Sequence, residues 1–196
     1  MSVTDEIVVG PLEIYLAAVS TAFPDVNAAP SVSWTKLGTT GDKNYDDSGV
    51  DVKLSQKVET FTPVGMTVPY KAYRTEEGLA IGFNLVDLSA AQFAKILDEA
   101  TVTATAATTS HPGYSTVQLL RGATVKTWAL IARGTGLSPA GPTFNLQIEA
   151  KKVFQSGDAI EMKFAKAPTM LAVEFTALGL SDGTFADLVV QTADHL

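Results

Sequence analysis

Residues 34–63 read WTKLGTTGDKNYDDSGVDVKLSQKVETFTP and carry the clearest structural signal in the chain. Residues 34–37 (WTKL) have the composition of a short strand. They lead into a polar, glycine-containing segment at 38–49. In the following segment, 50–61, apolar and polar residues alternate, which is the period-two pattern of a half-buried strand. Hairpin connections usually have about two to five residues, and 38–49 is much longer. We therefore expect a strand, a long inter-strand loop that reaches another molecule, and a second strand.

The composition indicates one mainly β domain spanning residues 1–196, with enough apolar residues for a core. Hydrophobic residues make up 46% of the 196 residues, and charged residues only 18%. Charged residues average about 25% in soluble domains, so the low value is compatible with a surface that neighbouring subunits cover. The net charge of −7 with 14 basic residues argues against a surface that follows nucleic-acid phosphates. Cysteine is absent, and we expect neither a signal peptide nor a membrane-spanning segment.

Alternation elsewhere in the chain predicts an antiparallel sandwich or barrel. Residues 75–77 are expected to form the turn between two of its strands, and the small residues Ala80, Gly82 and Asn84 suggest close packing on one sheet face. Besides 34–37 and 50–61, the expected strands are 12–19, 67–74, 78–86, 101–108, 125–132, 143–153, 159–164, 171–178 and 185–190.

One helix is predicted at residues 90–97, flanking the sheet. Ser89 and Gln92 have the spacing of a capping box, in which side chains satisfy free backbone N–H groups. Leu88 and Phe93 occupy the two positions of a hydrophobic staple. Asp87 places a negative charge beside the positive N-terminus of the helix.

None of the candidate chemical sites has a complete motif. Asp42, Asn44 and Asp46 have the alternate spacing of calcium ligands, but Asp47 and Lys53 stand where a calcium loop needs glycine and glutamate. The segment is better interpreted as a solvated interaction loop. Three other features lack the partners that catalysis or cofactor binding would need: the glycines at 134 and 136, the histidines at 111 and 195, and the glutamates at 76 and 77. We expect no enzyme activity, no metal and no cofactor.

Three blocks of the sequence resemble the major tail tube proteins of long-tailed bacteriophages. They are residues 34–63, the opening segment YLAAV at 15–19, and residues 70–85. The resemblance covers most of the chain and implies a β-sandwich with a flanking helix. It implies that six subunits form a ring and that rings stack into a tube that conducts DNA. The expected location is the virion tail, after synthesis in the host cytoplasm, and no membrane contact is implied.

The resemblance also implies partners and contact residues. The partners are copies of the chain itself, tail terminator and tail tip proteins, a tape-measure protein inside the tube, and DNA that passes without specific binding. Segments 2–9 and 191–196 become candidate arms. The inter-ring loop at 38–49 would make contacts through Gly38, Asp42, Lys43, Asn44, Tyr45, Asp46 and Asp47. Acidic residues on the polar sides of alternating strands are candidates for the channel wall, namely Glu149, Glu161 and Glu174.

Two alternatives remain open at this point. The chain could be the tube subunit of a contractile injection machine of the type VI secretion kind, which shares the fold and exports protein. It could also be a sugar-binding or adhesin-like sandwich, which should expose tryptophan and tyrosine around a groove.

Overall fold

The computed structural model describes residues 10–38, 44–86, 89–98, 100–119, 121–141, 143–157 and 169–193. As predicted, the protein is mainly β, with one helix in this described part. The helix α1 (Ala90–Ile96) lies between the fourth and fifth strands. The strands are β1 (Glu13–Ala18), β2 (Thr35–Lys36), β3 (Tyr45–Phe61), β4 (Lys71–Leu85), β5 (Val102–Thr105), β6 (Tyr114–Val117), β7 (Trp128–Gly134), β8 (Leu146–Gln155), β9 (Leu171–Ala177) and β10 (Ala186–Val190).

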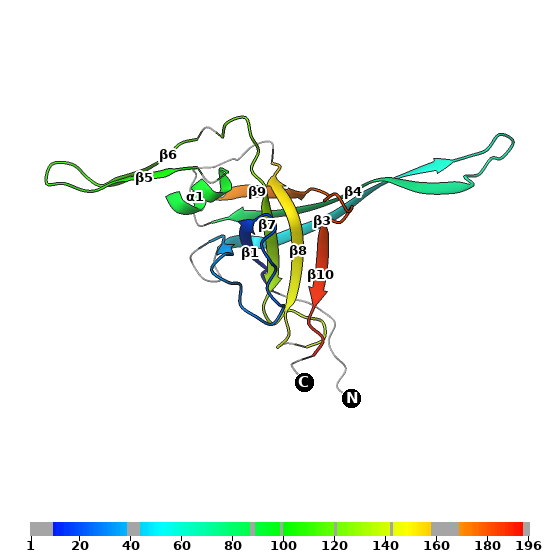
Figure 1. The fold of residues 1–196 in the computed structure, drawn as a ribbon, viewed down its shortest axis with the longest axis horizontal. Coiled ribbons are helices and arrows are strands. Elements are labelled where there is room, and N and C mark those ends of the chain that lie inside the picture. Colours follow the sequence, from blue (N-terminus) through cyan, green and yellow to red (C-terminus); the bar gives the residue numbers. More distant parts are fainter. Residues whose placement is uncertain are drawn as a thin grey trace.

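An antiparallel sheet forms the body of the molecule (Figure 1). Its strand order is β2-β1-β7-β8-β9-β4-β3, and β10 pairs with β8. Strand β8 belongs to two layers. It pairs with β7 from residue 146 to residue 153, and on its other side it pairs with β10 at 146–150 and with β9 at 153–155. In Figure 1, β7, β8 and β10 run across the direction of β3, β4 and β9. The sheet therefore turns at β8 and closes over a core, as in an orthogonal sandwich.

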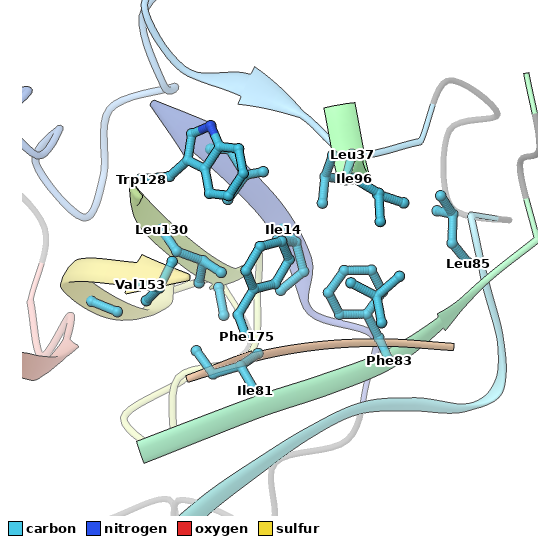
Figure 2. Packing of buried hydrophobic residues seen from close by; sticks show 14 of the residues in the cluster. Ile14, Leu37, Ile81, Phe83, Leu85, Ile96, Trp128, Leu130, Val153 and Phe175 are labelled. Atoms are coloured by element: carbon cyan, nitrogen blue, oxygen red, sulfur yellow. The ribbon is translucent and has the colours of Figure 1, made fainter. Parts of the chain in front are cut away.

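The core lies between these two layers and is built around Phe175 of β9 (Figure 2). The Phe175 ring stacks on Phe83 of β4 with 6.2 Å between centroids. It meets the Trp128 ring of β7 edge-on at 6.1 Å. Ile14 of β1 and Ile96 of α1 belong to the same buried cluster. Aromatic pairs in these geometries add to the stabilisation that apolar burial supplies.

Strand β7 is buried on both faces, in keeping with its apolar run at 128–132. One face joins the main core, and the other packs Ala129 and Ile131 against Trp34. Trp34 belongs to residues 21–34, a segment without regular structure between β1 and β2 that we call the strap. The indole Nε1 of Trp34 donates to the Ala22 carbonyl oxygen at 3.1 Å, and the Phe23 ring lies 5.3 Å from the Trp34 ring. The strap thus covers the second face of the β1 and β7 layer.

The predicted helix and its N-cap are confirmed. The Ser89 hydroxyl accepts from the Gln92 backbone N–H at 3.4 Å, and Ile96 is fully buried. The Gln92 side chain is also buried, and its Oε1 accepts from the Gly38 N–H at 3.1 Å. This bond ties the helix to the chain just after β2. The staple residue Leu88 and the dipole partner Asp87 lie outside the described residues.

The expected turn at residues 75–77 is wrong. Residues 71–85 form one continuous strand, and residues 62–70 make the hairpin connection from β3 to β4. A register shift falls between Lys57 and Val58, so that Thr75 is the additional residue of a β-bulge. A bulge accommodates the polar run without ending the strand. The strand expected at 159–164 lies outside the described residues.

The central position of Phe175 gives a test of the core. We expect Phe175→Ala to lower the free energy of unfolding by about 3–5 kcal/mol, because it removes a fully buried ring and leaves a cavity. Phe61→Ala is the matched control, because Phe61 is 56% exposed near the end of β3 and should cost under about 1 kcal/mol. Urea denaturation followed by tryptophan fluorescence measures both. Equal costs would show that Phe175 is not central to the core.

Candidate interaction surfaces

Of the predicted inter-strand loop at 38–49, residues 39–43 lie outside the described residues, and residues 45–49 belong to β3. The Tyr45 hydroxyl accepts from the Ile14 N–H and donates to the Leu37 carbonyl oxygen, both at 3.0 Å. Asn44 is buried. Its side chain fills the space that a Cβ on Gly38 would need, and Gly38 has a φ of +93° that favours glycine. Asn44 and Tyr45 therefore anchor β3 to the core and are not solvated contact residues.

The remaining residues of that segment do not assemble a cation site in the described structure. Asp46 accepts from the Ser48 hydroxyl and from Asn84 Nδ2 at 2.9 Å. Burial raises the pKa of Asp46, but the hydrogen bonds together outweigh it and hold the pKa below its ordinary value. Asp47 is exposed, and Asp42 and Lys43 lie outside the described residues. Within the described ranges, no three His, Cys, Asp or Glu side chains are grouped so as to hold a metal ion.

The most prominent surface is a β-hairpin that leaves the body of the molecule (Figure 1). We call residues 54–78, the outer parts of β3 and β4 with their connection, the long arm. Its strands are exposed on both faces, whereas the inner half of β4 alternates between buried and half-buried residues. Two strands without a supporting layer are only marginally stable in water. The long arm must therefore gain order from its own cross-strand pairs or from a partner.

Charged groups along the stem of the long arm, other than Lys71, have partners within the arm. Lys57 Nζ lies 3.4 Å from Glu76 Oε1, and the Tyr73 hydroxyl donates to Glu59 Oε2 at 3.2 Å. Arg74 donates from Nε to Gln56 Oε1 at 2.9 Å and pairs with Glu77. Exposed ion pairs contribute only about 0–1 kcal/mol each, so they fix strand register more than they stabilise the arm. The stem consequently has almost no net charge.

The tip of the long arm, residues 61–70, contains no charged residue. Its apolar side chains point into solvent, with Tyr70 73% exposed and Val64 wholly so. The exposed apolar residues of the tip are Phe61, Val64, Met66, Val68 and Tyr70. A contiguous exposed apolar patch on a soluble protein marks an interaction site or an aggregation hazard.

A second hairpin, β5 with β6, projects on the opposite side of the body (Figure 1). We call residues 102–117 the short arm. It is exposed along both strands, and its sequence contains no Lys, Arg, Asp or Glu. His111 lies in the connection between its strands, where its backbone N–H donates to the Thr108 hydroxyl at 3.2 Å. The molecule thus extends two hairpins of low charge in opposite directions.

A shallow hollow of about 660 Å³ lies over the outer face of β3, β4 and β9. Asp51, Gly82 and Glu174 stand side by side across these three strands, because Gly82 pairs with Asp51 on one side and with Glu174 on the other. Two carboxylates thus flank a position without a side chain, and we call this row the notch. Lys53 pairs with Asp51 at 2.9 Å, and the Ser156 hydroxyl donates to Glu174 Oε1 at 3.2 Å. The close packing expected on this face is not seen at Gly82, where a Cβ would meet only the Val173 carbonyl oxygen, at 3.9 Å.

The acidic residues predicted to line a channel have different environments. Glu174 is exposed in the notch, and Glu161 lies outside the described residues. Glu149 is half-buried on β8 and accepts from Gln147 Nε2 at 2.6 Å. Burial, together with the charge of Asp187 directly opposite on β10, raises the pKa of Glu149 despite the Gln147 hydrogen bond. Glu149 and Glu174 therefore lie on different layers of the sheet.

Sequence reasoning missed the buried polar group that holds the strap. Arg133 of β7 is buried and donates to the carbonyl oxygens of Ala28 and, at 2.6 Å, Val26. Gln147 Nε2 donates to the Pro24 carbonyl oxygen at 3.1 Å. A buried arginine is costly unless its donors are satisfied, and here backbone carbonyl oxygens of an irregular segment satisfy them. The feature of the sequence that could have revealed this group is the single arginine in the otherwise apolar sequence of β7.

The other residues singled out from the sequence form no common site. Glu76 and Glu77 lie on β4 and pair with Lys57 and Arg74. His195 and the segment 2–9 lie outside the described residues, as does the end of the 191–196 segment. Gln191 is buried, and its backbone oxygen accepts from the Ser138 hydroxyl at 2.6 Å. None of the described helices is both long and apolar enough to span a membrane.

Comparison with protein-family models finds no family that matches this chain, and a search of curated proteins finds no match either.

The strap contacts generate one prediction. We expect Arg133→Met to lower the free energy of unfolding by about 2–4 kcal/mol, because charged hydrogen bonds to carbonyl oxygens contribute about 1.5–3 kcal/mol each. Backbone amides of residues 21–33 should exchange faster in hydrogen-exchange mass spectrometry. Lys36→Met is the control, because it removes a partly exposed ion pair with Glu13 and should cost about 1 kcal/mol or less. Unchanged exchange in the strap would contradict this role.

The raised pKa of Glu149 predicts a pH-dependent effect on stability. The folded protein binds a proton at Glu149 more readily than the unfolded chain, so the ionised group disfavours folding. This destabilisation is absent when the pH is below the ordinary pKa of 4.5, and it is complete when the pH is above the raised pKa. We expect Glu149→Gln to raise the melting temperature at pH 7–8, with a gain that shrinks as the pH falls towards 4. Glu174→Gln is the exposed control, and a gain independent of pH would contradict the prediction.

Proposed function

We propose that this protein is a structural subunit that assembles with copies of itself into a tube of the phage tail tube class. The observation that carries the proposal is the long arm, whose uncharged apolar tip stands far from the core. A protein that worked as a monomer would gain nothing from exposing this surface and would risk aggregation. A subunit that buries the tip against its neighbours explains both its composition and its length.

The arrangement of the two arms supports repeated assembly. Because the long and short arms leave the body on opposite sides, one copy can contact neighbours on two different surfaces. Contacts between unlike surfaces generate rings when the rotation closes and open stacks when it does not. A tube of stacked rings uses both kinds of contact.

The open edges of the sheet support the same proposal. Within the described residues, β3 has no partner on its outer side, and β10 pairs only with β8. Leu188 of β10 is also largely exposed. Unpaired edges invite association unless something covers them, and joining the sheets of adjacent subunits in a ring would do so.

The proposed cargo is DNA, which the tube would conduct without binding it. A subunit with a net charge of −7 repels phosphate rather than retaining it. Through the sequence resemblance, the proposal also includes rings of six subunits and a location in the virion tail. Its further partners are tail terminator, tail tip and tape-measure proteins. A contractile injection machine that exports protein remains the structural alternative.

A specific observation disfavours the sugar-binding alternative. Both tryptophans, Trp34 and Trp128, are buried in the body and cannot stack on a sugar. The exposed tyrosines Tyr70, Tyr73 and Tyr114 lie on the two hairpin arms rather than around a groove.

Electron microscopy of the purified protein over a concentration series tests the proposal. We expect stacked rings or tubes with a central channel at high concentration. Replacing residues 62–70 with Asn-Gly closes the hairpin with a two-residue turn between the paired residues Phe61 and Lys71. This variant should keep the melting temperature of the wild type, because the tip lies outside the core, and should lose assembly. A wild type that stays monomeric at every concentration would overturn the proposal.

A further inference from the structure

The notch combines three properties of a receiving surface. It is concave, it has no side chain at its centre, and carboxylates stand on both sides of that centre. Adjacent strands are about 4.8 Å apart, so Asp51 and Glu174 stand roughly 10 Å from each other across Gly82. That gap suits one extended side chain with a cationic end. Lys53 pairs with Asp51 and also interacts with the charge of Glu174, so two carboxylates face one ammonium group and the notch keeps an acidic excess.

The long arm presents a matching group. Lys71 directly follows the uncharged tip and stands opposite Phe61 in the hairpin. It forms no ion pair within the described residues, whereas Lys57 and Arg74 on the stem are both paired. The end of the arm therefore combines apolar side chains with one uncompensated positive charge.

We propose that the tip of the long arm of one copy docks into the notch of a second copy, with Lys71 between Asp51 and Glu174. This inference rests on the proposed self-assembly and names the surface that receives the arm. Apolar tip residues fill the hollow, and the ammonium group satisfies the acidic excess. Opposite charges across the contact fix its register, and the apolar burial stabilises it.

The positions of tip and notch let this contact propagate. Both lie on the same pair of strands, because β4 runs from Lys71 at the tip to Gly82 in the notch. At about 3.3 Å per residue, the two surfaces are roughly 35 Å apart along β4. A copy that inserts its tip into a neighbour leaves its own notch open for the next copy. The contact is therefore between unlike surfaces and repeats in one direction.

Gly82 permits a steric test that leaves the fold intact. A Cβ at Gly82 would meet its nearest atom, the Val173 carbonyl oxygen, at 3.9 Å, which is ordinary contact. Gly82→Val fills the notch with a residue that strands favour. Gly179→Val is the matched control, because a Cβ there has open space and the position lies outside the notch.

The first experiment uses the absence of cysteine from the chain. Differently tagged Val68→Cys and Gly82→Cys proteins are mixed with oxidised glutathione, which accepts the electrons of the new disulfide. We expect a mixed dimer from this pair and none from Val68→Cys with Gly179→Cys. Equal yields from the two mixtures would overturn the proposal, because a disulfide needs Cα atoms within about 7 Å.

The second experiment reverses charges and follows assembly by light scattering and microscopy. We expect Lys71→Glu and Glu174→Lys each to raise the concentration for half-assembly at least about tenfold, since losing a desolvated charge pair costs more than 1.4 kcal/mol. The double variant with both reversals should return to within about threefold of the wild type. Lys152→Glu on β8 changes the net charge by the same amount and should have no such effect.

The outcomes separate this inference from the proposed function. Tubes that form equally well from the wild type, Gly82→Val and Lys71→Glu would overturn the docking and leave the proposed function standing. If Glu174→Lys alters DNA passage without altering assembly, Glu174 belongs to the channel wall and the docking is wrong. A wild type that never assembles and gives no mixed disulfide overturns both.

Discussion

The structure depends on the way β8 divides its hydrogen bonds among three strands. It pairs with β7 from residue 146 to residue 153, and on its other side its first residues pair with β10 and its last residues with β9. Between Ala150 and Val153 the register with β7 shifts, so the strand can bend and point side chains into the core at both ends. That bend brings the two layers over Phe175. Without it, the layer that carries the long arm would have no core to rest on.

Much of this fold follows from the sequence, because burial imposes a period on side chains. Alternation at 143–153 correctly predicts β8, and the capping pair Ser89 and Gln92 correctly predicts α1. The sequence did not predict how far the strands extend beyond the core. The outer parts of β3 and β4 face solvent on both sides, so neither side has to be apolar and the period is lost. The polar run at 75–77 then resembles a turn.

The interaction surfaces were harder to predict than the fold for a related reason. Segment 38–49 is polar and glycine-rich, yet Asn44 is buried and the Tyr45 hydroxyl meets backbone groups of Ile14 and Leu37. The buried role of Arg133 was missed for the same reason, because its sequence neighbours in β7 are apolar. The notch depends on pairing between β4 and strands distant in sequence, so local patterns cannot reveal the row formed by Asp51, Gly82 and Glu174.

The distribution of charge connects the stable body to its arms. The long arm contains equal numbers of acidic and basic residues, and the short arm has none. The net charge of −7 therefore resides mainly on the body. Bodies that repel one another at long range can still associate through neutral arms, because apolar contact acts only at short range and salt screens the repulsion beyond about 8–10 Å. Such a balance suppresses random aggregation while permitting contacts in which a tip enters a complementary surface.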